Sequence, residues 1–289
     1  MTRKREEKLH RTGGAKIVFA IVLVIFTAYV LAIAFALFWA FYSSLKTNGE
    51  FFENMVAFPK KLLFSNYGKA FEKLKYNGTG FFGMFVNSAW FALGSAVLGA
   101  FMPSVTGYVF ARYGFKCKEF AFSVILLTIT LPIVGSLTSM YRVVYFLGIN
   151  DSPLYLITAL GGFGANFLIM YAFFKGIDKA YSEAAEVDGA GHFYIFLRIM
   201  LPFAFGPLFA LTIVGFIAQW NNYETPLLFL DRMPTLASGL YRYSLYMKHH
   251  SDQPVYYAGV LMSVVPVIVI VAAFGGRIMK NMSIGGLKG

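Results

Sequence analysis

The apolar run from Ile17 to Tyr42 is the feature that most restricts the folds open to this chain. No charged side chain interrupts it. It is longer than the roughly 7–15 apolar residues at the centre of a signal peptide, and no convincing cleavage site accompanies it. A helix of about 20 apolar residues is long enough to cross a bilayer. We therefore predict an uncleaved membrane span, with Trp39, Phe41 and Tyr42 as its outer aromatic anchor.

The composition supports a chain that lies mostly in the membrane. Hydrophobic residues make up 58% of the 289 residues and charged residues only 13%, which is outside the usual range for soluble domains. The net charge of +11 would suit a nucleic-acid partner, but the basic residues lie mainly beside apolar runs, where they set topology and contact anionic lipid. No nucleic-acid-binding motif is present. We predict an all-α membrane protein that contacts the lipid bilayer and no nucleic acid.

Five further apolar runs bring the predicted transmembrane helices to six. They are Phe81 to Phe110, Phe120 to Tyr141, Leu154 to Phe174, Pro202 to Trp220 and Tyr256 to Phe274. Polar segments separate them, and the one over residues 221–254 is predicted to be a polar external hairpin.

The predicted helices divide the chain into four parts. Residues 1–16 form an N-terminal segment, residues 17–80 the first span and an external segment, residues 81–276 a core of five helices, and residues 277–289 a C-terminal tail. Because Lys and Arg accumulate in the first and last parts, we predict that both termini are cytoplasmic.

The loop over residues 175–201 contains a polar segment unlike the rest of the chain, Glu183-Ala184-Ala185-Glu186-Val187-Asp188-Gly189-Ala190. Its small side chains allow a helix to lie close against another protein surface. Asp188-Gly189 predicts a break between two short helices, because glycine admits the backbone angles that end a helix. This pattern favours a docking element, although its spacing is equally compatible with an ordinary helical loop.

This segment, followed by Ile199 and Leu201-Pro202, resembles the EAA loop of binding-protein-dependent ABC importer permeases. Trp220-Asn221-Asn222-Tyr223 and the terminal Gly285-Gly286-Leu287-Lys288-Gly289 are similar to features of the maltose-type carbohydrate permeases. The likeness covers nearly the whole chain. One difference lies at the loop entry, where Asp178 to Ser182 replace the Ile-Pro and Glu-Leu-Glu-Glu pattern frequent in the family.

The resemblance implies a type I ABC importer permease fold with six spans in the bacterial cytoplasmic (inner) membrane. It also implies four kinds of partner contact: a second homologous permease subunit, two ABC ATPase subunits, an extracytoplasmic sugar-binding protein and the bilayer. The residues implied to couple this chain to the ATPases are Glu183, Ala184, Ala185, Asp188, Gly189 and Ala190.

The chain itself lacks the phosphate-binding loop of an ATPase. That loop requires Gly-x-x-x-x-Gly-Lys, whereas the one Gly-Lys pair, Gly68-Lys69, has Leu63 at the first glycine position. We therefore predict that the chain is not an enzyme and holds no cofactor or metal ion, and that ATP and Mg are bound by partner ATPase subunits.

Polar and aromatic residues near the spans are candidates for the substrate path, because sugars are bound by aromatic faces and by groups that satisfy their hydroxyls. For the asparagines within spans, an interhelical hydrogen bond is the alternative role, and for the two aromatic residues an interfacial anchor is the alternative. The candidates are Asn87, Asn166, Gln219, Trp220, Asn221, Asn222 and Tyr223.

Two other classes of protein are less compatible with this sequence. An ion-coupled secondary transporter would need acidic residues within its spans, but Asp and Glu lie almost wholly in the loops. A membrane enzyme would need a catalytic set of side chains, and none is evident. The sequence therefore favours the permease subunit of an ATP-driven sugar importer.

Overall fold

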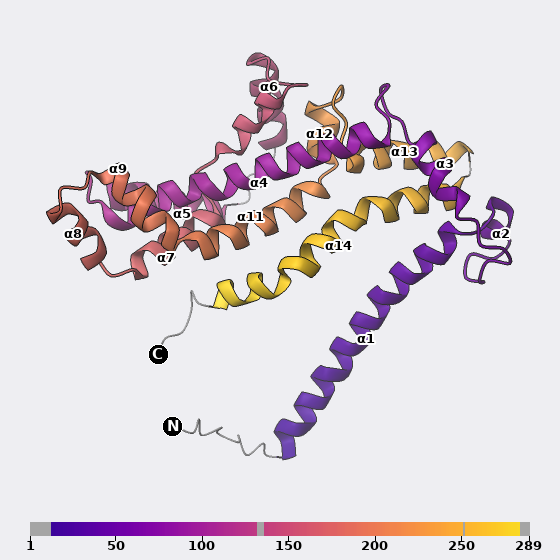
Figure 1. Cartoon of the computed structure of the whole chain (residues 1–289), viewed down its shortest axis with the longest axis horizontal. Helices are drawn as coiled ribbons and strands as arrows, with labels where there is room; N and C mark the ends of the chain where they lie inside the picture. Colours follow the sequence, from indigo (N-terminus) through magenta and orange to yellow (C-terminus); the bar gives the residue numbers. More distant parts are fainter. Residues whose placement is uncertain (1–12, 132–135, 251, 284–289) are drawn as a thin grey trace.

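The chain folds into helices arranged as an elongated bundle with one helix set apart (Figure 1). A computed structural model describes residues 13–131, 136–250 and 252–283. Within these ranges the only β-structure is an isolated bridge between Tyr76 and Thr79. The predicted all-α fold is therefore observed throughout the described part of the chain.

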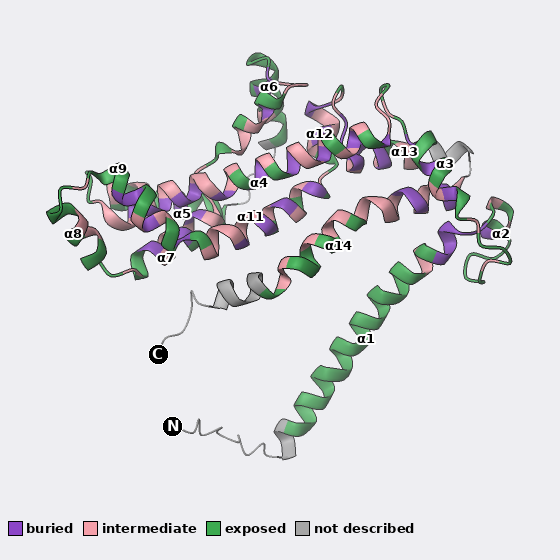
Figure 2. Cartoon of the chain, viewed as in Figure 1, coloured by how far each residue is buried: buried purple, intermediate pink, exposed green. Residues whose placement is uncertain are grey.

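Helix α1, Gly13–Ser44, contains the first predicted span. Its most apolar window is 0% buried, and it diverges from the other helices along most of its length (Figures 1 and 2). Its final turns contact other elements, where the ring of Trp39 lies 5.2 Å from that of Tyr257. In a membrane, such a surface faces lipid or another subunit.

Helix α4, Phe81–Arg112, is the central element of the bundle. Small side chains recur along it at four-residue intervals, which places them on one face of a helix, and all are buried: Ser88, Ala92, Ala96, Ala100 and Ser104. Helix α11, Phe205–Trp220, approaches this face so closely that a Cβ on Gly215 would lie 3.4 Å from Ala96. Within a bilayer, the hydrophobic effect does not drive helices together, so they associate mainly through close packing. Small residues allow the two backbones to approach closely enough for such packing.

The fourth predicted span is broken in two. A 3-10 helix, Pro153–Leu160, and helix α7, Ala165–Gly176, meet at 57° across the glycines of residues 161–164. Side chains at the break make hydrogen bonds to and from α4: Thr106 donates to the carbonyl of Gly162 at 2.6 Å, and Asn166 donates to that of Gly99 at 3.0 Å. Such bonds make interrupted backbone tolerable at membrane depth.

The fifth span begins after a second bend. Helix α9, His192–Ile195, continues through a π-helical turn, Phe196–Met200, into α10, Leu201–Phe203. This unit meets α11 at 72°. The expected helix from Pro202 to Trp220 therefore starts with a sharp change of direction, just after Pro202.

The third predicted span corresponds to α5, Lys118–Thr130, and α6, Ser136–Phe146. Residues 132–135, in its middle, lie outside the described residues. Elsewhere in the described chain, three helices are long and apolar enough to cross a membrane, and two bent pairs bring the number to five.

The polar segments between the spans contain short helices, as expected for the external segment after the first span. The external segment forms α2, Asn48–Glu53, and α3, Ser65–Lys73. Residues 221–254, predicted as a polar hairpin, contain α12, Glu224–Phe229, and α13, Leu236–His250, and α13 buries Leu236 and Leu240. The amide of Leu236 donates to Ser88 Oγ at 2.7 Å, which fixes the start of α13 on α4.

The last span, α14, runs from Gln253 to Ser283 and therefore extends into the predicted C-terminal tail. Residues 1–12 and 284–289, which include most of the predicted N-terminal segment and the glycine-rich end, lie outside the described residues. The first residue of α1 and the last residue of α14 both lie away from the end that carries α2 and α3 (Figure 1).

A glycine on α4 offers a test of this packing. A Cβ on Gly107 would lie 2.8 Å from the backbone nitrogen of Tyr171 on α7, whereas one on Gly99 would meet nothing within 4 Å. Because backbone cannot yield as a side chain does, we expect Gly107→Ala to destabilise the protein by about 1–3 kcal/mol. Thermal denaturation of the purified protein would show a lower midpoint for Gly107→Ala and little change for Gly99→Ala. Equal midpoints would contradict the described contact between α4 and α7.

Candidate functional site

The polar loop singled out in the sequence forms a short helix at one end of the bundle. Helix α8, Ala180–Val187, starts after Asp178, whose Oδ1 accepts the amide of Ala180 at 3.0 Å. It leads through a tight turn into α9, and both lie at the end of the molecule opposite α2 and α3 (Figure 1).

Helix α8 ends where the sequence predicted a break. Gly189 has φ +82, a conformation that side chains rarely adopt. The amide of Ala190 donates to the carbonyl of Ala185 at 2.9 Å, and that of Gly189 donates to the carbonyl of Glu186 at 3.0 Å. This pair of bonds is the Schellman arrangement, which satisfies carbonyls at a helix end. The turn is therefore fixed by the backbone.

The six coupling candidates lie on two different faces. Ala185 and Ala190 pack against a buried cluster of their own chain that includes Phe174 and Met200. The other four are exposed: Glu183, Ala184, Asp188 and Gly189. The alanines on the inner face hold α8 to the bundle, and the outer face is available to a partner.

Two large apolar side chains that the sequence analysis did not select also belong to this exposed end. Val187 is 88% exposed and Phe193 is 75% exposed. Apolar side chains this far into solvent mark an interaction surface when they occur together with polar neighbours. Together with Glu183 and Ala184, they define what we call the α8–α9 surface.

Contacts from the end of α4 hold this loop in place. Arg112 Nη2 donates to the carbonyl of Ile177 at 2.7 Å, where α7 ends. The ring of Tyr113 lies edge-on to that of His192 at 5.3 Å, and His192 Nδ1 lies 3.9 Å from Glu186 Oε1. These residues are far apart in sequence, so spacing gave no signal for them. They connect α8 and α9 to the end of α4.

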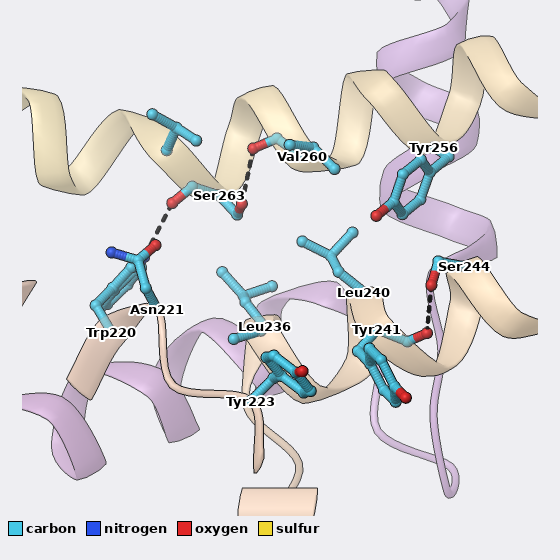
Figure 3. A pocket seen from close by; sticks show the side chains of 12 residues that line it. Trp220, Asn221, Tyr223, Leu236, Leu240, Tyr241, Ser244, Tyr256, Val260 and Ser263 are labelled. Atoms are coloured by element: carbon cyan, nitrogen blue, oxygen red, sulfur yellow. Dashed lines mark hydrogen bonds between the residues drawn. The ribbon is translucent and has the colours of Figure 1, made fainter. Parts of the chain in front are cut away.

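A cavity of about 270 Å³ lies between α11, α13 and α14, toward the other end of the molecule. Three substrate-path candidates line it, namely Trp220, Asn221 and Tyr223. The remaining lining residues come from α13 and α14: Leu236, Ala237, Leu240, Tyr241, Ser244, Tyr256, Val260, Ser263 and Val264. Figure 3 shows Tyr223 and Tyr241 side by side below the two facing helices.

Aromatic residues play two roles in this cavity. Trp220 is only 4% exposed and donates from Nε1 to the carbonyl of Ser263 at 2.9 Å, so it ties α11 to α14 as part of the wall (Figure 3). Tyr223 and Tyr241 stack with ring centroids 4.5 Å apart and an interplanar angle of 21°. Tyr223 is exposed, so an aromatic surface remains open at this site.

The other four candidates form hydrogen bonds within the fold. Asn87 Nδ2 donates to the carbonyl of Pro234 at 3.0 Å, and Asn166 bonds to Gly99 as described for the α7 break. Asn222 Nδ2 donates to Gln219 Oε1 at 3.1 Å. The bond of Asn166 joins α7 to α4, and that of Asn87 joins α4 to the loop before α13. In the described part of the chain, no group of three or more His, Cys, Asp or Glu is placed to hold a metal ion.

Comparison with known proteins gives this arrangement a family. Residues 104–282 match the family described as "Binding-protein-dependent transport system inner membrane component". The chain belongs to this family. The matched region starts within α4 and contains the α8–α9 surface and every residue that lines the cavity.

Similar proteins include permeases of several sugar transport systems. The diacetylchitobiose uptake permease NgcG of Streptomyces coelicolor is 26% identical over 86% of this chain and 82% of its own length. The arabinooligosaccharide permease AraQ of Bacillus subtilis is 28% identical over 88% and 90%. A bacterial ABC transporter that imports the acidic polysaccharide alginate contains a chain with a TM-score of 0.72, at 19% identity, over 92% of this chain and 98% of that one.

These findings confirm the predicted type I permease fold and the role of the family member as a permease subunit, not an enzyme. They place the chain among inner-membrane components of transport systems that use a binding protein. The alternative of an ion-coupled secondary transporter is not supported.

The turn after α8 generates a prediction for this permease. Alanine at Gly189 would have to adopt the left-handed conformation at a cost of roughly 1–2 kcal/mol, whereas Gly191 has φ −72 and open space around it. We expect Gly189→Ala to speed hydrogen exchange at the amide of Ala190 by about tenfold, and Gly191→Ala to leave it unchanged. Exchange measured by mass spectrometry on peptides covering residues 185–195 tests this. Unchanged exchange in Gly189→Ala would show that the turn is not held by its backbone bonds.

Proposed function

We propose that this chain is one of two permease subunits of an ATP-driven importer for a sugar or oligosaccharide. The observation that carries the proposal is the exposed α8–α9 surface in a chain that belongs to the binding-protein-dependent permease family. The substrate class is supported by relatives whose named substrates are diacetylchitobiose, arabinooligosaccharides and maltodextrin, and by the aromatic lining of the cavity.

In this proposal the α8–α9 surface docks on an ABC ATPase. Two ATPase subunits bind ATP and Mg, and their closure displaces α8. Glu183 is the polar contact, and Val187 and Phe193 supply apolar area that becomes buried. Because Arg112 and His192 connect this loop to the end of α4, the displacement reaches the helix around which the bundle is packed. Coupling of this kind requires that the ATPases contact the surface differently in their open and closed states.

The proposed orientation puts the α8–α9 surface and both chain termini in the cytoplasm of a bacterial cell. The start of α1 and the end of α14 lie on the side away from α2 and α3, which supports a common side for both ends (Figure 1). The cavity then lies toward the extracytoplasmic side, where substrate arrives.

The opposite end of the molecule provides a rigid rim for the sugar-binding protein. Asp231 joins two loops there: the hydroxyl of Tyr76 and the amide group of Asn77 both donate to its carboxylate. The amide of Arg232 donates to Asp151 Oδ1 at 2.8 Å, which brings in a third loop. Burial and the bond to Asp231 raise the pKa of Tyr76 above its ordinary value.

The substrate path is proposed to run along the cavity, between this chain and the second permease subunit. The stacked rings of Tyr223 and Tyr241 offer an aromatic face to a sugar ring. Asn221 lines the same cavity and lies near Trp220 and Ser263 (Figure 3). Asn87, Asn166, Gln219 and Asn222 are proposed to shape this path through the hydrogen bonds that hold α4, α7 and α11, and Trp220 does so as a wall.

The coupling role is tested with ATP hydrolysis by the complete complex in lipid. We expect Glu183→Ala combined with Val187→Asp to abolish stimulation by the loaded binding protein, or to release the ATPases on purification, since an added charge opposes burial of this surface. Glu119→Ala combined with Lys116→Ala, exposed residues at the same end of the molecule, should behave as the parent. Full stimulation in the first variant would reject the docking role.

The substrate role is tested with uptake into proteoliposomes. We expect Tyr241→Ala to raise the concentration of loaded binding protein needed for half-maximal uptake by roughly three- to tenfold, because an aromatic contact contributes on the order of 1 kcal/mol. Tyr29→Ala, on the exposed side of α1, serves as the matched control. Uptake driven by an ion gradient without ATP would overturn the proposed function itself.

A further inference from the structure

The chain between α2 and α3 folds back along the outer end of α1. Residues 54–64 form no helix, and they bring the ring of Phe58 to 4.8 Å from that of Tyr42 and 6.1 Å from that of Phe38. Phe38 lies one helical turn further along α1 toward the middle of the span. The segment therefore lies beside the last turns of a membrane helix, as the loop next to α2 in Figure 1 shows.

Three side chains of the preceding chain satisfy consecutive backbone carbonyls of this segment. Lys46 Nζ donates to the carbonyls of Asn54 at 3.1 Å and Met55 at 3.0 Å. Trp39 Nε1 also donates to Met55, at 2.9 Å, and the hydroxyl of Tyr42 donates to the carbonyl of Val56 at 2.8 Å. Non-helical backbone can lie at the edge of a bilayer only if its polar groups are bonded in this way.

Lys46 is the unusual member of this set. Its residue is only 1% exposed, and a buried ammonium group is costly unless its donors are bonded. Burial lowers the pKa of Lys46, and the nearby carboxylate of Glu50 partly opposes that effect. Its ammonium group also lies 5.1 Å from the centre of the Tyr42 ring. A buried lysine directed at backbone carbonyls holds the segment in one place.

The other side of the segment is both apolar and basic. Val56 is 65% exposed, and Phe58 is 70% exposed although its ring contacts those of Tyr42 and Phe38 on α1. Further exposed apolar side chains are Met55, Leu62 and Phe64. Lys60 and Lys61 lie among them, and both are exposed. Apolar side chains mixed with lysines are typical of segments that lie at the boundary between acyl chains and anionic headgroups.

We propose that residues 54–64 form a wedge that inserts into the lipid interface at the outer end of α1. Phe58 and its apolar neighbours enter the acyl-chain boundary, and Lys60 and Lys61 contact the phosphates of the headgroups. The wedge holds α1 in the bilayer, a helix whose most apolar window is not buried by its own chain.

The test uses fluorophores attached to single cysteines in the complete complex, reconstituted with anionic lipid in nanodiscs. Cys117, which is free and exposed, is first replaced by serine. Val56→Cys and Phe58→Cys are labelled in separate samples, and Glu72→Cys on α3, also exposed, is the matched control. We expect a nitroxide-bearing phospholipid to quench the labels at 56 and 58 several-fold more than aqueous iodide does, and the order of the two quenchers to be reversed at 72.

The lysine clamp is tested with the label at position 56. Lys46→Met should make that label accessible to iodide, because two carbonyl bonds are lost, whereas Lys69→Met, an exposed lysine on α3, should not. Strong iodide quenching at 56 and 58 in the parent would place the segment in water and overturn the proposal. Protection from both quenchers would show that a protein, such as the second permease subunit, covers the segment, and would overturn it equally. Lipid quenching that survives Lys46→Met would remove the role assigned to Lys46.

Discussion

Close contact along the small-residue face of α4 is the constraint on which the remaining structure depends. Lipid tails are as apolar as leucine, so helices within a bilayer gain little from hydrophobicity when they associate. They gain from packing, and packing improves when backbones approach. Ala96 on α4 and Gly215 on α11 permit that approach, and Gly107 does the same toward α7. The surrounding helices take their positions from α4.

The two bends in the bundle change the course of the chain around α4. The break in the fourth span near Gly162 allows a short 3-10 helix to pack on α4. The bend before α11 gives α9 and α10 a direction different from that of the fifth span, at the end of the molecule that carries the α8–α9 surface. At each bend some backbone N–H and C=O groups lose their partners within the helix, which is unfavourable inside a membrane. Polar side chains of the chain itself, Thr106 and Asn166 at the first bend, provide the compensating hydrogen bonds.

Local sequence predicted those features that local chemistry determines. Length and hydropathy predicted α1, α4 and α14. The Asp188-Gly189 pair predicted the end of α8, because glycine readily adopts the positive φ that ends a helix. Features that depend on distant pairs were not predicted. Arg112 meets Ile177 only after two spans have packed, and Tyr241 joins the cavity only because α13 lies on α14. Tyr241 belongs to residues 221–254, which were predicted to be a polar hairpin. Only a few apolar residues of this segment are buried, so its sequence did not indicate a packed helix.

The separation of α1 from the bundle has an evolutionary consequence. Its most apolar window is not buried by its own chain, so within this subunit selection there acts mainly on length and mean hydropathy and less on which apolar residue occupies each position. The small-residue face of α4 has no such latitude. The two helices should therefore record ancestry at different speeds, with α1 losing its resemblance to related permeases long before α4 does.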